Sequence, residues 1–117
     1  MERKLEIGTE KYTQVYAIDE KEFNANHQYS ISTTNEPSTI LGVINLQKGA
    51  IKENGVNGVM NEDLIAIVID RLMSFQESSF KCRENAIAIT KLEEALLWLR
   101  KRTMDREKRN VEGTHTI

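Results

Sequence analysis

The sequence predicts an α+β fold, in which a small N-terminal antiparallel β-sheet is followed by a long C-terminal α-helical hairpin. Three observations support this prediction. The first half of the chain alternates strand-forming side chains, a glycine-rich segment lies near the middle, and the second half repeats apolar residues every three to four positions. The glycine-rich segment divides the chain into a sheet region, residues 1–58, and a hairpin region with a basic C-terminal tail, residues 59–117.

Three short strands are expected before the glycine-rich segment. Residues 12–18 and 28–34 place strand-forming side chains at every second position. The asparagine and proline between residues 35 and 38 indicate a turn, after which a third strand covers residues 39–46. Three strands of this length form a small sheet whose apolar face needs a cover.

The segment 47–60 carries the strongest turn signal in the chain, with three glycines and two Asn-Gly pairs. We interpret it as the boundary between the sheet and the hairpin. An alternative interpretation is a phosphate cradle built from Lys48, Gly49 and Lys52, although their spacing matches no P-loop.

The first helix of the hairpin is predicted from Asn61 to about Gln76. Asn61 suits the N-cap position, and the two acidic residues that follow it complement the positive end of the helix dipole. An apolar stripe at helical spacing supports this helix, with three further apolar residues that widen it. The stripe is Ile65, Val68, Leu72 and Phe75, and the widening residues are Leu64, Ile67 and Met73. A buried strand is the alternative, because the segment contains a β-branched run.

The second helix is predicted from near Cys82 to about Arg109, because this segment has no glycine or proline and is rich in strong helix formers. Its apolar seam follows a strict 3–4 repeat. The seam residues are Cys82, Asn85, Ile89, Leu92, Leu96, Leu99 and Thr103. Leu97 and Trp98 lie off this seam, so a lone hairpin cannot bury them and we expect self-association.

Charge and composition exclude several classes of protein. The net charge of −2 argues against a partner such as long nucleic acid. The single cysteine is typical of a reducing cytosol, and the charged first residues do not resemble a signal peptide. The longest apolar run, residues 64–69, is far shorter than the ~20 residues that a membrane span needs. We therefore expect a cytoplasmic protein with no membrane partner.

No motif for catalysis or metal binding is recognisable. His27 and His115 belong to no metal motif, and the sequence has no G-x-S-x-G elbow and no acidic metal cluster. We expect a protein that is not an enzyme, with no catalytic residue, no metal ion and no cofactor.

Candidate ligand-binding residues lie near the bend of the hairpin. Asn85 interrupts the apolar seam, where its amide either fixes the register of the helices or recognises a polar ligand. Phe75 either packs in the core or offers its ring to a stacked base. Arg83 would reach a phosphate at the same bend.

A second candidate site lies at the basic C-terminal end. Residues 1–80 carry 7 basic and 12 acidic side chains, whereas residues 81–117 carry 9 basic and 6 acidic ones. Basic residues in the last turns of a helix also complement its dipole, which is the simpler explanation. Beside Arg109, Gly113 permits close approach of a ligand and Thr114 supplies a hydroxyl, a set suited to a phosphodiester.

The stretch CRENAIAITKLEEALLWLRKRTMDREKRNVEGTH, which begins at Cys82, resembles the hairpin domain of phage anti-defence sponges. It is most similar to the Thoeris anti-defence sponges of the first type, whose hairpin is shared with an anti-CBASS cyclic-nucleotide sponge. The preceding ILGVINLQKGAIKENGVNGVMNEDLIAIVIDRL resembles the same group, so the resemblance covers nearly all of the chain beyond about residue 10.

This resemblance implies a protein that binds its ligand without cleaving it. Members of the family sequester cyclic ADP-ribose isomers made by Thoeris enzymes, and some also hold cyclic di- or trinucleotides in separate pockets. They combine an antiparallel sheet with a helical hairpin, assemble as homodimers or homohexamers, and act in the cytoplasm of the infected bacterial host.

The resemblance also carries residue roles to this chain. The family's aromatic residue and asparagine at the signal pocket match Phe75 and Asn85. Its arginine and threonine associated with cyclic trinucleotides match Arg109 and Thr114, whereas Asn110 departs from the glycine that the family pattern has there. The alternative is a structural protein whose hairpin only assembles a helical bundle, which predicts no thermal shift with any nucleotide.

Overall fold

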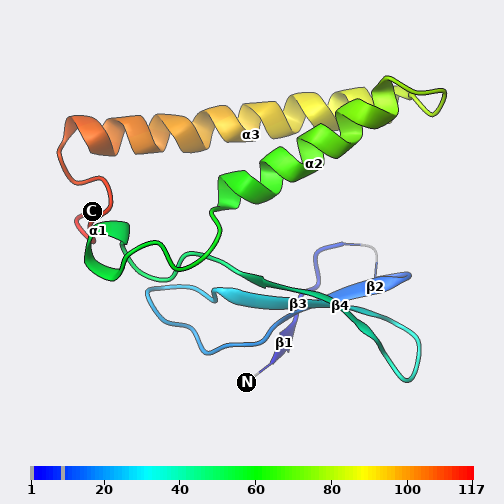
Figure 1. The fold of residues 1–117 in the computed structure, drawn as a ribbon, viewed down its shortest axis with the longest axis horizontal. Coiled ribbons are helices and arrows are strands. Elements are labelled where there is room, and N and C mark those ends of the chain that lie inside the picture. The colour runs from blue at the N-terminus through cyan, green and yellow to red at the C-terminus, as the bar shows by residue number, and fades with distance from the viewer. Residues whose placement is uncertain (1, 9) are drawn as a thin grey trace. The chain divides into compact units, whose positions relative to one another are not determined.

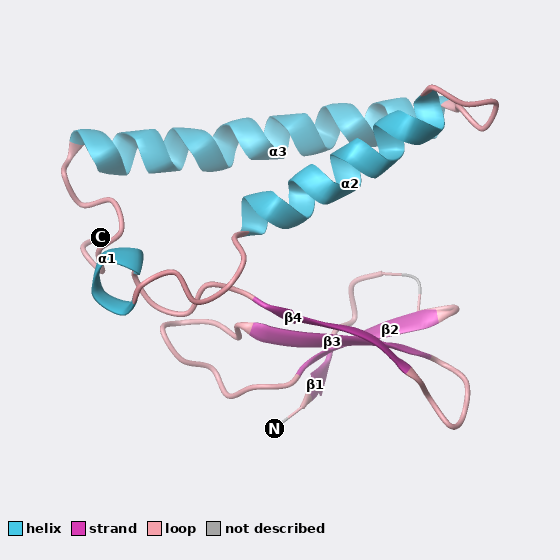
Figure 2. Cartoon of the chain, in the orientation of Figure 1, coloured by secondary structure: helices cyan, strands magenta, loops and turns pink. Residues whose placement is uncertain are grey.

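The computed structural model describes residues 2–8 and 10–117, and its contacts divide the chain into two compact units, Met1–Val59 and Met60–Ile117. The first unit holds a four-stranded antiparallel sheet and the second holds two long helices (Figures 1 and 2). The predicted α+β fold is therefore confirmed.

The sheet has the strand order β1-β2-β3-β4, in which every neighbouring pair is antiparallel. Its strands are β1 (Arg3–Lys4), β2 (Thr13–Ala17), β3 (Gln28–Thr33) and β4 (Ile40–Asn45). The three predicted strands are confirmed within one or two residues at each end. β1 was not predicted, because two residues are too few to show a period-two pattern.

Polar contacts contribute much of the order in the sheet unit. Among the described residues, Ala17 is the buried apolar side chain, whereas Asn26, Ser30 and Ser32 are buried polar ones. Asn26 is held from both sides, because its amide donates to the backbone carbonyl of Asp19 at 2.7 Å and accepts from the Arg3 guanidinium at 2.9 Å. A buried amide with all of these partners ties β1 to the loop between β2 and β3.

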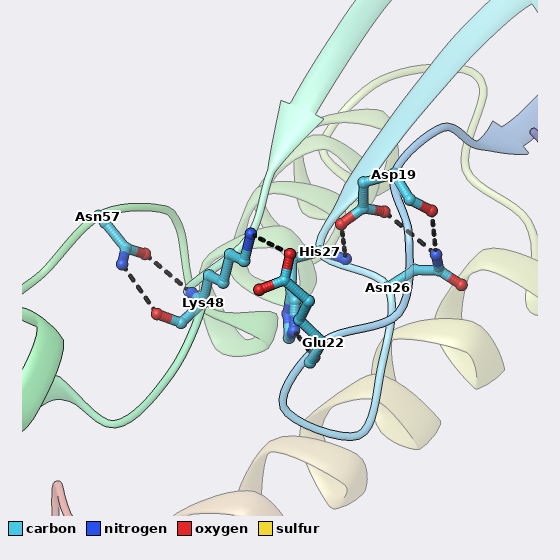
Figure 3. Close-up of polar contacts among 6 residues, drawn as sticks. All are labelled: Asp19, Glu22, Asn26, His27, Lys48 and Asn57. Carbon is cyan, nitrogen blue, oxygen red and sulfur yellow. Dashed lines mark hydrogen bonds and ion pairs between the residues drawn. The ribbon is translucent and has the colours of Figure 1, made fainter. Parts of the chain in front are cut away.

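The carboxylate of Asp19 is a second anchor of that loop (Figure 3). It accepts the backbone N–H of His27 at 3.0 Å and the side-chain amide of Asn26 at 3.1 Å. Burial raises the pKa of the Asp19 carboxyl, but these hydrogen bonds, with one from the backbone of Gln28, lower it more, so that it lies below its ordinary value. The carboxylate is thus the form that the folded loop prefers.

The glycine-rich segment folds back onto β4 and includes a short helix, α1 (Ile51–Asn54), which the turn signals did not predict. Val59 donates to the carbonyl of Asn45 at 2.9 Å, and Gln47 donates back to Val59 at 2.9 Å. Gly58 permits this approach, because a Cβ atom there would lie 2.5 Å from the backbone of Leu46. The segment is therefore part of the sheet unit.

The phosphate cradle considered for this segment is not supported. The side-chain amide of Gln47 fills the loop, donating to the carbonyls of Gly49 at 3.1 Å and Gly55 at 2.7 Å and accepting the N–H of Asn57 at 3.0 Å. Asn57 pairs in turn with the backbone of Lys48, whose ammonium lies 3.1 Å from the Glu22 carboxylate (Figure 3). The carbonyls of this loop already accept hydrogen bonds from Gln47 and Asn57, and a carbonyl oxygen does not attract an anion.

The hairpin unit consists of α2 (Asn61–Gln76) and α3 (Arg83–Lys108), which pack along each other. The helical interpretation of the β-branched run is therefore correct. The N-cap of α2 is Met60 rather than Asn61, because the carboxylate of Asp63 accepts the backbone N–H of Met60 at 2.9 Å and starts the helix one residue earlier. No helix in the described part of the chain is long and apolar enough to cross a membrane.

The predicted seam of α3 is confirmed over the helix itself. Its members from Asn85 to Thr103 are all half-buried, and Ala88 and Ala95 join them on the same face. Cys82 is the exception, because it is exposed and precedes the first helical residue. The 3–4 repeat thus identified the packing face of this helix.

Candidate functional site

The apolar stripe of α2 divides into two faces. Ile65, Ile69 and Leu72 are half-buried on the face toward α3, whereas Ile67 is 63% exposed and Phe75 is 39% exposed. The sequence placed Phe75 on the same stripe as Ile65 and Leu72, and this assignment is wrong. Phe75 therefore belongs to an outer face of α2, where it is open to other molecules.

This outer face forms an open pocket of about 830 Å³ at the bend of the hairpin, which we call the bend pocket. Eight residues of α2 and of the following loop line it: Ala66, Ile67, Asp70, Arg71, Ser74, Phe75, Ser78 and Phe80. Its lining is mainly apolar and aromatic, with one acidic and one basic side chain, a composition typical of small-molecule sites.

Side-chain hydrogen bonds fix the loop that carries two of these lining residues, Ser78 and Phe80. The amide of Gln76 donates to the carbonyl of Cys82 and accepts its N–H, both at 3.0 Å. Ser78 donates to the carbonyl of Phe75 at 2.6 Å and accepts the N–H of Phe80 at 3.1 Å. The loop therefore has a defined conformation without an apolar core of its own.

Asn85 lies in the first turns of α3, half-buried in the apolar seam. Its side-chain amide makes no hydrogen bond within residues 2–8 and 10–117, and it remains open to solvent, because every fully buried side-chain nitrogen or oxygen in these residues has a partner. Arg83, the first residue of α3, is exposed, and its guanidinium also makes no hydrogen bond or salt bridge with the described residues. Of the three residues predicted at the bend, only Phe75 lines the bend pocket within a single chain.

The C-terminal tail folds back on the end of α3 through an arginine to which the sequence gave no role. The guanidinium of Arg106 donates to the carbonyls of Val111 at 3.1 Å and Thr114 at 3.0 Å. In the sequence Arg106 is one of several basic residues between positions 100 and 109, so only the structure shows that it holds the tail. The guanidinium of Arg109, by contrast, forms no hydrogen bond or salt bridge in the described part of the chain.

Asn110 occupies the left-handed conformation that glycine takes at the end of many helices, with φ of 58°. The N–H of Asn110 donates to Glu107 and that of Val111 donates to Arg106, both at 3.0 Å, which is the Schellman pattern. Gly113 also has a positive φ, of 74°, and the Thr114 hydroxyl donates to the carbonyl of Val111 at 2.5 Å. The tail is therefore an ordered turn beside a free Arg109.

A second concavity, of about 340 Å³, lies on the sheet unit between the ends of β2, β3 and β4. Its lining residues are Asp19, His27, Gln28, Asn45, Leu46, Lys48 and Asn57. Their polar side chains are largely engaged in contacts within the unit: the His27 ring donates to the Glu22 carbonyl at 2.6 Å, and Gln28 donates to Asn45 at 2.9 Å. We interpret this concavity as part of the structure of the sheet rather than as a site.

Across residues 2–8 and 10–117, no cluster of three or more His, Cys, Asp or Glu side chains is arranged to hold a metal ion. Three side chains of the hairpin unit described above, Arg83, Asn85 and Arg109, instead make no hydrogen bond or salt bridge with the described residues. Such groups suit the recognition of a phosphate-bearing ligand.

Two comparisons relate this geometry to known proteins. The family model described as the hairpin domain of Acb2/Tad1 matches residues 39–104. A protein named Thoeris anti-defense 1, from Bacillus phage SBSphiJ7, is 46% identical to this chain over 97% of each protein. The matched segment contains the whole of the hairpin bend, including Phe75, Arg83 and Asn85.

Proposed function

The chain belongs to the Acb2/Tad1 hairpin family, and from this premise we propose that it is a phage anti-defence sponge that sequesters a cyclic ADP-ribose isomer without cleaving it. Binding alone would be its activity, in the cytoplasm of the infected bacterial host. The name of its relative, Thoeris anti-defense 1, supports a target in the Thoeris system.

The amide of Asn85 is the observation that carries this proposal. It is half-buried in an apolar seam and has no hydrogen-bond partner among the described residues. An amide with two donors and an acceptor matches the polar edge of a base or ribose, which would satisfy it on binding. Phe75 would supply a ring for stacking and Arg83 a cation for phosphate.

The site is proposed to lie where copies of the chain meet, in a homodimer or homohexamer. Within one chain the bend pocket takes in Phe75 but neither Arg83 nor Asn85. On α3, Trp98 is 70% exposed and Leu97 and Met104 are also exposed, and such residues favour self-association. A second copy would then bring the separate groups of two bends to one ligand.

Calorimetry with a purified cyclic ADP-ribose isomer tests the proposal. Wild-type protein should bind tightly, and heating the complex should release the ligand intact. Asn85→Ala should weaken binding at least tenfold, because a ligand polar group loses its partner, a loss of about 1.4 kcal/mol or more. Asn61→Ala, which changes an exposed asparagine outside the bend, is the matched control and should bind as the wild type does.

Three outcomes count against it. Recovery of a hydrolysed product would favour an enzyme. If Asn85→Ala dissociates the assembly, Asn85 fixes the register of the helices. If no cyclic nucleotide in a panel raises the melting temperature, the hairpin is a structural bundle and the sponge proposal is wrong.

A separate pocket for a cyclic di- or trinucleotide is proposed at the C-terminal turn. The free guanidinium of Arg109 lies beside an ordered turn that contains Gly113 and Thr114, a set that suits a phosphodiester. The double variant Arg109→Ala, Thr114→Ala should lose cyclic trinucleotide binding and keep binding of the cyclic ADP-ribose isomer. Unchanged trinucleotide binding would place this ligand elsewhere.

A further inference from the structure

The glycine-rich segment contains two Asn-Gly pairs, Asn54-Gly55 and Asn57-Gly58, which the fold holds in different ways. Asparagine is chemically labile, and it deamidates most readily before glycine. Glycine has no side chain to hinder the approach of its nitrogen to the side-chain carbonyl carbon of the asparagine. Because the two pairs share the same chemistry, their surroundings decide which of them reacts.

Asn57 is held by hydrogen bonds on both sides of its amide. Its Oδ1 accepts the backbone N–H of Lys48 and its Nδ2 donates to the carbonyl of Lys48, both at 2.8 Å (Figure 3). Its own N–H donates to the side chain of Gln47 at 3.0 Å. Gly58 has no room to move toward it, because a Cβ atom there would lie 2.5 Å from the backbone of Leu46. Ring closure at this pair would have to break several contacts together.

Asn54 is exposed and is the last residue of α1, a helix of four residues. Its amide donates to the carbonyl of Ala50 at 3.2 Å, and the N–H of Gly55 donates to the carbonyl of Ile51 at 2.8 Å. A single helical turn is marginal and its ends fray, so these bonds open more readily than the contacts of Asn57. Beyond its chain neighbours, a Cβ atom on Gly55 would meet no atom of the described residues within 4 Å, which leaves room for the movement.

From this contrast we infer that Asn54-Gly55 is a site of spontaneous deamidation in the folded chain and that Asn57-Gly58 is protected. When the turn opens, the backbone nitrogen of Gly55 attacks the side-chain Cγ of Asn54. A bond forms between these atoms, the bond from Cγ to Nδ2 breaks, and ammonia leaves with the proton of the attacking nitrogen. Water then opens the resulting succinimide at either carbonyl, so that residue 54 becomes aspartate or isoaspartate.

Either product weakens the loop that Gln47 holds. A carboxylate at position 54 cannot donate to the carbonyl of Ala50, and its charge is unfavourable at the C-terminal end of a helix. Isoaspartate also inserts an extra carbon into the main chain next to Gly55, whose carbonyl accepts the Gln47 amide at 2.7 Å. The reaction therefore makes a transient opening of this loop permanent. It concerns the sheet unit and does not depend on the proposed function.

Peptide mapping by mass spectrometry tests the inference on the full chain, incubated at mildly alkaline pH. Replacement of the amide –NH2 by –OH raises the mass of a peptide, and methylation by a protein isoaspartate methyltransferase identifies isoaspartate. In the folded chain, Asn54 should react roughly tenfold faster than Asn57 or more, because fewer hydrogen bonds must open. In urea, where no loop holds either pair, the two rates should become similar. Asn54→Gln is the matched control and should abolish the reaction at this position, because its side chain would have to close a larger ring.

Two further measurements test the physical cause. Gln47→Ala should raise the rate at Asn57, because it removes the partner of the Asn57 N–H. Aged wild-type protein should exchange the Asn57 amide faster than fresh protein does. Equal rates at the two pairs in the folded chain, a faster reaction at Asn57, or an unmodified Asn54 after the denatured chain has reacted would overturn the inference. Ligand binding by fresh protein tests the sponge proposal separately, so either idea can fail without the other.

Discussion

The sheet unit and the hairpin unit are held together by different kinds of contact. In the sheet unit, Asn26, Gln47 and Asn57 all hydrogen-bond within the unit, and Lys48 pairs with Glu22. In the hairpin unit, an apolar seam holds the helices, and several polar groups at the bend have no partner in the described chain. A group whose hydrogen bonds are already made has little to offer a ligand, so the difference directs attention to the hairpin.

Truncating a side chain in the apolar seam of α3 should lower the stability more than any other substitution considered below. Leu96→Ala removes a half-buried side chain of the seam, and we expect it to destabilise the hairpin by about 2 kcal/mol. Leu97→Ala, at an exposed position next to it, should leave the stability of the single chain nearly unchanged. Chemical denaturation followed by NMR, with separate resonances from each unit, measures both.

The same experiment tests whether the units are independent. If sheet resonances disappear together with hairpin resonances in Leu96→Ala, the two units unfold cooperatively and the comparison drawn above fails. If the sheet persists after the hairpin has unfolded, each unit has a stability of its own.

Substituting either of the two glutamines whose side chains hydrogen-bond to a loop backbone should cause an intermediate loss of stability. Gln47→Ala removes three hydrogen bonds in the sheet unit, and Gln76→Ala removes two at the hairpin bend. We expect losses of about 1–2 kcal/mol for Gln47 and about 1 kcal/mol for Gln76, because each bond contributes a modest net amount. Amide hydrogen exchange at Asn57 and at Cys82 reports the two openings, and equal protection in variant and wild type would show that the side chain does not hold the loop.

Acid should affect the sheet unit in a way that depends on Asp19, with the smallest effect of the three. Its pKa in the folded chain lies below the ordinary value of 3.8, so the carboxylate stabilises the loop above that pH. This contribution is lost as the pH falls below 3.8 and through the folded pKa. Asp19→Asn should make the stability of the sheet less dependent on pH in this range.

Asp105, in the hairpin, is the control for this experiment. The hydrogen bond and charge of Lys101 lower its pKa as well, but the carboxylate is exposed and solvent screens the pair. Asp105→Asn should therefore change the acid response of the hairpin very little. A larger effect from Asp105 than from Asp19 would show that the hydrogen bonds of Asp19 are not what makes the sheet unit sensitive to acid.

The sequence by itself determined the elements in which a helical or strand repeat continues over at least five residues. The seam from Asn85 to Thr103 was read correctly because each apolar side chain recurs at the spacing of a helix face. The three longer strands were placed because alternation over five or six residues is visible in the sequence. The two-residue β1 and the four-residue α1 were missed because neither is long enough to show a period.

Only the tertiary structure decided which apolar residues of α2 remain open. Its apolar residues extend around much of the helix, so the sequence assigned Val68 and Phe75 to the stripe and left out Ile69, whereas the structure half-buries Ile69 and exposes the other two. The role of Arg106 in holding the tail, and the position of Phe80 at the bend pocket, likewise depend on where the chain turns back on itself. A periodic pattern fixes which side chains share a face of one element, but contacts between elements depend on turns whose geometry the pattern does not contain.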